Sequence, residues 1–124
     1  MVERVTGLGG PFIKAKDPQQ LAAWYEKHLG IAFNGTTYAA WQPGKMPATG
    51  FTLFSIFPED SDYFSPSRKD VMVNFMVKDL KELLAALKNE GVEIVGNPVE
   101  EEYGKFGWVL DPEGNKIELW EPPV

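Results

Sequence analysis

Apolar positions in the first part of the chain follow two periods, which predict a strand and then a helix. Residues 10–16 alternate with the period of two that is typical of a strand. Residues 18–29 instead place large apolar side chains at helical spacing, at Leu21, Trp24, Tyr25 and Leu29. Asp17, with Gln20 three residues later, predicts the start of this helix, and Gly30 predicts its end.

Three further β-prone runs follow this helix, at residues 31–33, 38–41 and 51–57. Asn34-Gly35 lies between the first two, and this dipeptide between β-prone runs is a strong hairpin signal. Residues 59–69 are then polar and rich in turn-forming residues, which is typical of a linker. The first half therefore predicts the order β-α-β-β-β, followed by a linker.

The same order of elements begins again after the linker. Residues 71–77 predict a strand, and Asp79 with Glu82 predicts a capped helix that ends at Gly91. Its apolar face consists of Leu80, Leu83, Leu84 and Leu87. The remaining expected strands are residues 92–95, 106–110 and 116–120.

The two halves match each other closely in register. Lys16-Asp17 and Lys78-Asp79 are 62 residues apart, and Gly30 and Gly91 are 61 apart. Any two β-α units share some features, but cap, helix face, terminal glycine and following strand all agree here, which favours an internal duplication. We expect a single domain, residues 1–124, that contains module 1 (about 1–58), a linker (59–69) and module 2 (about 70–124).

Composition and charge exclude several classes of function. Eighteen acidic residues against twelve basic ones give a net charge of −6, which disfavours nucleic-acid and membrane partners. The absence of cysteine excludes disulfides, iron–sulfur clusters and thiol catalysis, and a single histidine restricts metal chemistry. Residues 1–7 contain no apolar signal-peptide core, so we expect a cytoplasmic protein.

Three stretches, residues 17–31, 74–80 and 106–120, carry a family resemblance. The most specific is the last, which contains Asp111-Pro112-Glu113-Gly114-Asn115. The chain resembles the vicinal oxygen chelate superfamily, which includes glyoxalase I, bleomycin-resistance proteins and extradiol dioxygenases. The resemblance implies an α+β fold in which two βαβββ modules form a cupped mixed sheet around a ligand pocket, with helices on its outer face. It does not fix the function, because one fold hosts many activities.

Metal-using members of the superfamily chelate one divalent ion inside the cup, and the resemblance places four ligand positions on this chain. They fall at Gly10, at Met72, at Glu118 and within residues 51–57, which contain no His, Asp or Glu. Glycine has no donor atom, and a thioether is too soft for such ions. His28 lies on the predicted helix outside the cup, where we expect a surface or helix-terminal residue. We therefore expect neither a metal nor another cofactor.

Strand alternation predicts which residues face the cup. Glu118 lies between Ile117 and Leu119, and Asn74 lies between Val73 and Phe75, so both polar side chains are expected to face away from the helices. Each either contacts a ligand or closes a structural hydrogen-bond network. The aromatic candidates either line a cavity or belong to the core. The expected ligand-binding residues are Phe12, Lys14, Trp41, Phe54, Met72, Asn74, Tyr103, Trp108 and Glu118.

Two residues have further interpretations. Lys14 is either a contact to an anionic ligand group or an exposed lysine at the end of a strand. Tyr63-Phe64 places two aromatic side chains in an otherwise polar linker, where they either cover the pocket or bury in a dimer contact.

Three functions are compatible with these patterns. The first is a metal-independent protein that binds a small organic molecule in the cup, and the acidic charge suits a cationic ligand. The second is a glyoxalase-like lyase or isomerase with Glu118 as general base. The third is an interaction module with an unused cup. Exposed strand edges and the resemblance favour a homodimer in each case.

Overall fold

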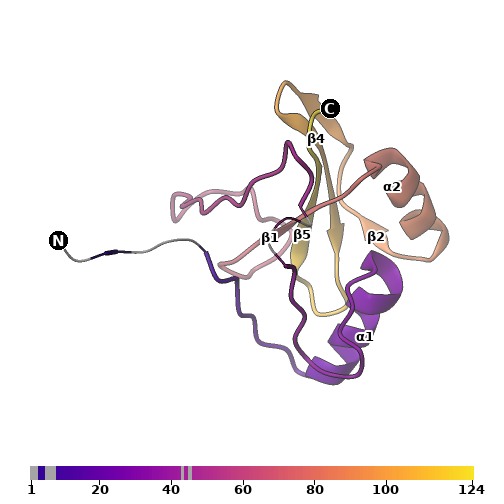
Figure 1. Ribbon diagram of the computed structural model, residues 1–124. Helices are drawn as coiled ribbons and strands as arrows, with labels where there is room; N and C mark the ends of the chain where they lie inside the picture. Colours follow the sequence, from indigo (N-terminus) through magenta and orange to yellow (C-terminus); the bar gives the residue numbers. More distant parts are fainter. Residues whose placement is uncertain (1–2, 5–7, 43, 45) are drawn as a thin grey trace.

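The computed structural model describes residues 3–4, 8–42, 44 and 46–124. Most of residues 1–7, on which the expected localisation rests, lies outside these described residues. A single mixed sheet stands at the centre, and both helices lie on the same side of it (Figure 1). The elements are α1 (Pro18–Leu29), β1 (Val73–Met76), α2 (Leu80–Asn89), β2 (Glu93–Ile94), β3 (Val99–Glu101), β4 (Gly104–Leu110) and β5 (Lys116–Glu121). Neither described helix is long and apolar enough to cross a membrane.

Both helices begin as the sequence predicts. The Asp17 side chain accepts a hydrogen bond from the backbone N–H of Gln20 at 3.0 Å, and Asp79 does the same for Glu82 at 3.0 Å. Each bond satisfies a backbone donor that has no partner within its helix. Gly30 then ends α1 with a φ of 69°, in the left-handed region that favours glycine.

The strands of the second half form one sheet in the order β1-β5-β4-β2, with β3 paired to β4. The β1–β5 pair is parallel, and the other pairs are antiparallel. This arrangement confirms the α+β class and the expected strands at 71–77, 92–95, 106–110 and 116–120. The sequence patterns missed β3, because all three of its residues are exposed and no apolar alternation marks them.

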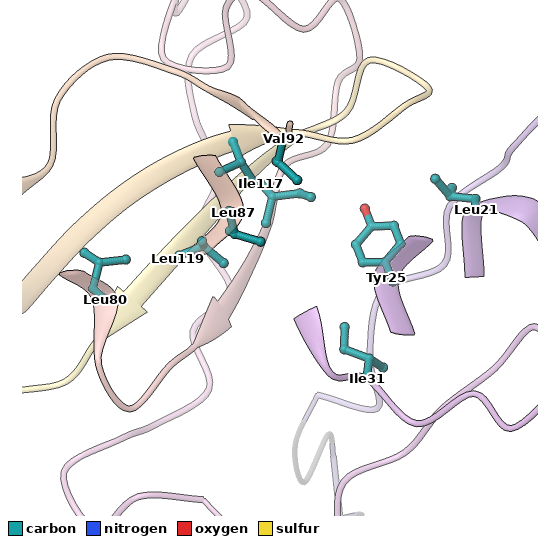
Figure 2. Packing of buried hydrophobic residues seen from close by; sticks show 9 residues of the cluster. Leu21, Tyr25, Ile31, Leu80, Leu87, Val92, Ile117 and Leu119 are labelled. Atoms are coloured by element: carbon teal, nitrogen blue, oxygen red, sulfur yellow. The ribbon is translucent and has the colours of Figure 1, made fainter. Parts of the chain in front are cut away.

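The core lies between the two helices and the sheet (Figure 2). Ile117 and Leu119 of β5 and Val109 of β4 are fully buried, and they belong to one cluster with side chains of both helices. Phe75 and Val77 pack against this cluster, as strand alternation predicts. The opposite face of β5 therefore presents Lys116, Glu118 and Trp120. The members from the helices and the segments that follow them are Leu21, Tyr25, Ile31, Leu80, Leu87 and Val92.

The first half of the chain corrects part of the sequence prediction. Residues 10–16, 31–33, 38–41 and 51–57 form no strands, although the expected turn is present with Asn34 at a φ of 54° and Gly35 at 83°. A strand is stable only when its backbone groups pair and one of its faces is buried. None of these segments pairs with a strand, and several of their large side chains are exposed, such as Phe12, Ile56 and Phe54 at 97%, 84% and 78%.

Gly104, at the start of β4, provides a sensitive test of this packing. Its φ is +131°, and a Cβ built there would lie 2.4 Å from the Glu121 carbonyl oxygen. We expect Gly104→Ala to lower the free energy of unfolding by about 2–3 kcal/mol, because strain and a backbone clash act together. Urea denaturation measures this change. Gly9→Ala, where a Cβ meets nothing within 4 Å, is the matched control and should have little effect.

Candidate ligand site

Three polar side chains lie abreast on the face of the sheet that points away from the core. The strand register pairs Asn74 of β1 with Glu118 of β5, and Glu118 with Trp108 of β4. Side chains at paired positions of neighbouring strands point to the same face. The register alone therefore brings an amide, a carboxylate and an indole into one row.

Hydrogen bonds join this row through the carboxylate of Glu118. Asn74 Nδ2 donates to Glu118 Oε1 at 2.8 Å, and Trp108 Nε1 donates to Oε2 at 2.8 Å. The hydroxyl of Tyr63 donates to the same Oε2. Glu118 is only 8% exposed, so these three neutral donors replace the water that would otherwise solvate its charge.

Lys116 completes the cluster on the same strand. Its ammonium lies 5.2 Å from the ring centre of Tyr63 and 5.5 Å from that of Trp108, within cation–π range. The same ammonium donates to the carbonyl of Tyr63 at 2.6 Å. Burial lowers the pKa of Lys116, and Glu118 and Asp62 oppose that shift. The hydrogen bond from Lys116 to the Tyr63 carbonyl therefore holds the linker against the sheet.

Tyr63 is held in its protonated form. Burial, followed by the hydrogen bond to Glu118, raises the pKa of its hydroxyl well above the ordinary value. The phenol therefore remains a donor toward the carboxylate at neutral pH.

The donor set around Glu118 does not fit a divalent metal. Its partners are three neutral N–H or O–H donors, none of which is an anionic ligand, and the neighbouring ammonium is a cation. Among the described residues, no three His, Cys, Asp or Glu side chains gather in a way that could hold an ion. Gly10 and Met72, the equivalent ligand positions, supply no hard donor.

The structure unites only part of the set predicted from sequence. Asn74, Trp108 and Glu118 meet, and Met72 is half-buried near the start of β1. The others lie apart from the carboxylate or are exposed: Phe12, Lys14, Trp41, Phe54 and Tyr103. Tyr103 instead packs edge-on against Phe106. The role of these five residues as ligand contacts stays a prediction.

Sequence reasoning left Tyr63 and Lys116 out of the expected ligand-binding set. The signal for Tyr63 was present, since two aromatic residues in a polar linker are expected to pack against something. The signal for Lys116 was its position two residues before Glu118, which places both side chains on the same face of β5.

His28 links the last turn of α1 to Glu90, the residue that follows α2. Its Nδ1 lies 2.7 Å from Glu90 Oε1, a residue that stands 62 positions further along the chain. His28 therefore lies in the last turn of α1, as expected, and has no contact with the Glu118 cluster.

A second polar cluster surrounds the buried carboxylate of Asp111. Tyr25 donates to Oδ2 at 2.8 Å, and the side chain of Asn115 donates to the same oxygen at 2.6 Å. The backbone N–H groups of Glu113 and Asn115 donate to Oδ1. Glu113 in turn accepts from the backbone of Lys16 and Asp17, and these bonds lower its pKa. This turn therefore anchors α1 to the sheet.

Tyr25 makes stability sensitive to alkaline pH. Burial, then the charge of Asp111, raises its pKa above the ordinary value of 10.0. The contribution of Tyr25 to the free energy of unfolding is therefore complete below about pH 10. It is lost as the pH rises further, because the unfolded chain releases the tyrosine proton at a lower pH than the folded chain. Tyr25→Phe should flatten the alkaline limb of urea-denaturation stability and cost about 1–2 kcal/mol at neutral pH. Tyr38→Phe, at an exposed tyrosine, should leave both unchanged.

Two hollows on the surface lie away from Glu118. One of about 410 Å³ is lined by Trp24, Val92 and Asp111, and another of about 310 Å³ is lined by acidic residues near the end of β5. Glu118 lines neither of them. The polar chemistry of the sheet face is concentrated instead where Tyr63 packs on Glu118.

Comparison with known proteins decides the family. The model of the glyoxalase-like domain matches residues 11–120, nearly the whole chain. The chain belongs to the glyoxalase-like domain family. This assignment places it in the vicinal oxygen chelate superfamily, as the sequence motifs predict. No curated protein sequence matches it significantly.

Solved structures share the fold of this glyoxalase-like chain at low sequence identity. A superfamily member from Sphaerobacter thermophilus has a TM-score of 0.57 and 17% identity, and the match covers 94% of this chain and 98% of that one. A glyoxalase family protein from Bacillus anthracis has a TM-score of 0.55 and 20% identity, with coverages of 99% and 100%.

A third structure is TnmS3, described as an antibiotic binding protein from a Streptomyces species. It has a TM-score of 0.55 and 23% identity, and the match covers 90% of this chain and 91% of that one. In three other matched structures the chain spans only about half of the partner, 46%, 45% and 52% of its length.

Proposed function

We propose that this glyoxalase-like protein binds a small organic molecule on the sheet face beside Glu118, without a metal ion. The observation that carries the proposal is the environment of that carboxylate. A recessed charge bound only by neutral donors is an anchor for a ligand that itself donates a hydrogen bond. The aromatic side chains around it offer the apolar contact area that small-molecule sites use.

The choice of a binding function over catalysis follows from the same donor set. In glyoxalase chemistry a metal ion polarises the carbonyl oxygen of the substrate, and the hydrogen-bond partners of Glu118 include no second carboxylate and no imidazole to hold one. The protein itself supplies three hydrogen bonds to Glu118, which leaves about one of the four lone-pair sites of a carboxylate for a donor on the ligand.

The structural neighbour TnmS3 supports a ligand-binding role by analogy. Its description names it as an antibiotic binding protein, and its fold is shared along nearly the whole chain. One fold hosts many activities. The analogy therefore supports a binding role, but the proposal rests on the residues around Glu118.

A ligand screen on metal-stripped protein tests this proposal. The full chain is treated with EDTA and screened by thermal shift against bleomycin and a panel of aromatic amines, phenols and amides. We expect saturable stabilisation of the wild type by one class, reduced at least tenfold in affinity by Glu118→Gln. Equal shifts in both proteins would contradict the proposal, as would metal-dependent formation of lactoylglutathione from methylglyoxal and glutathione.

We also propose that the protein is a homodimer in which the two modules of one domain pair with those of a second copy. The segment 51–57 has no strand partner, and its Phe54 and Ile56 side chains are 78% and 84% exposed. In the described part of the chain, β1 ends the sheet and pairs only with β5. An open edge and unpaired β-prone segments favour pairing between two chains.

Light scattering coupled to size-exclusion chromatography tests the dimer. We expect twice the 13.9 kDa chain mass for the wild type. The double variant Phe54→Asp/Ile56→Lys should elute as a monomer, because charges on this face oppose burial. Lys81→Glu, on the exposed side of α2, is the control and should remain dimeric. A wild type that is monomeric at 100-fold dilution and at high concentration alike would overturn the dimer.

A further inference from the structure

The phenol ring of Tyr63 is contacted on several sides by other side chains. Phe57 stacks on it, with ring centres 5.3 Å apart and planes 26° from parallel. Trp108 approaches edge-on at 6.2 Å and 84°, and the Lys116 ammonium lies 5.2 Å from the ring centre. Glu118 accepts the hydroxyl proton. Every recognition element that a free phenol would need is therefore in place.

These contacts divide into a rigid part and a movable part. Glu118, Lys116 and Trp108 belong to β4 and β5, the central paired strands of the sheet. Tyr63 and Phe57 belong to the segment between residues 51 and 70, which contains neither helix nor strand. Segments without such pairing open at lower free-energy cost than core strands. Tyr63 is also 37% exposed. The sheet therefore provides a binding surface, and the Tyr63 side chain from the linker occupies it.

We propose that the sheet face beside Glu118 is a binding site for phenols, and that Tyr63 occupies it as an internal mimic of the ligand. This inference rests on the proposed function, because it names the ligand class of that same site. The ligand is an aromatic ring that bears a hydroxyl group, and on binding it takes the position of the Tyr63 side chain.

The charges around the ring explain why this class is favoured. The carboxylate of Glu118 accepts a hydrogen bond from a hydroxyl group and repels an aryl carboxylate. The ammonium of Lys116 attracts an electron-rich ring face by a cation–π interaction, and a phenol provides such a face. An arene without a hydroxyl group would leave the carboxylate with one donor fewer than it has now.

Removal of the mimic provides the experiment. The probe is p-cresol, which is the tyrosine side chain as a free molecule, titrated by calorimetry into the full-length Tyr63→Ala variant. We expect one site per chain, with an affinity for p-cresol at least tenfold higher than for toluene. A hydrogen bond to a charged group contributes at least this difference in affinity. Wild type should bind p-cresol at least tenfold more weakly than the variant, since its own tyrosine competes. Tyr38→Ala, at a remote exposed tyrosine, should behave as wild type.

A second measurement covers the case in which Tyr63→Ala does not fold. In the wild-type chain, millimolar p-cresol should shift the ring resonances of Tyr63 in NMR spectra, and toluene should not. Equal affinity of the variant for p-cresol and toluene, or unshifted Tyr63 resonances when the variant is unfolded, would overturn the phenol assignment. If other panel compounds still bind in a Glu118-dependent way, the proposed function stands while the phenol class fails.

Discussion

Asp111→Ala is expected to lower the free energy of unfolding by about 3–5 kcal/mol, since each buried donor left without an acceptor costs roughly 1–3 kcal/mol. The carboxylate is 5% exposed and accepts from the Tyr25 hydroxyl and from two groups of Asn115. Its loss would release both α1 and the turn before β5. Chemical denaturation followed by tryptophan fluorescence measures the effect.

The matched control for Asp111 is an exposed aspartate in the linker. Asp60→Ala should change stability by less than about 0.5 kcal/mol, as surface substitutions usually do. A small effect of Asp111→Ala, close to that of the control, would show that this turn does not anchor the first helix.

Glu118→Ala is expected to remove ligand binding and to destabilise the protein by about 2–3 kcal/mol. Three donors would lose their common partner, but Asn74 and Tyr63 are exposed enough to regain water, which limits the loss. Affinity for any ligand found in the screen should fall by about tenfold to a hundredfold. Calorimetric titration and urea denaturation of the same variant measure the two effects.

The control for Glu118→Ala separates shape from charge. Glu118→Gln keeps the size of the side chain, and its amide can accept only on one oxygen. It should recover much of the stability and little of the affinity. If Glu118→Gln binds ligand as well as wild type, the carboxylate is structural and the site lies elsewhere.

The sequence was most informative where local signals are strong. The caps at Asp17 and Asp79, the turn at Asn34-Gly35 and the orientation of Glu118 follow from short patterns whose physical cause is local. The row of Asn74, Glu118 and Trp108 required the strand register, which no local pattern determines. The alternation of apolar residues did predict that Asn74 and Glu118 lie off the core face.

The same patterns were wrong for the strands of the first half. Alternation at 10–16 and 51–57 indicates a capacity to pair, but pairing also requires a neighbouring strand. Tyr63 illustrates the opposite limit, because its contacts with Glu118 and Lys116 link residues 53 or more positions apart. Contacts across such distances depend on tertiary structure, which the local patterns of the linker do not contain.

Calorimetric titration with divalent metal ions tests the central claim most directly, namely that this protein retains a metal-chelating fold but uses Glu118 as a hydrogen-bond anchor. EDTA-treated wild type and Glu118→Gln are titrated separately with Zn²⁺, Ni²⁺ and Mn²⁺. We predict only weak binding, with no stoichiometric site and no difference between the two proteins. One ion bound per chain with submicromolar affinity in the wild type, lost in Glu118→Gln, would contradict the claim.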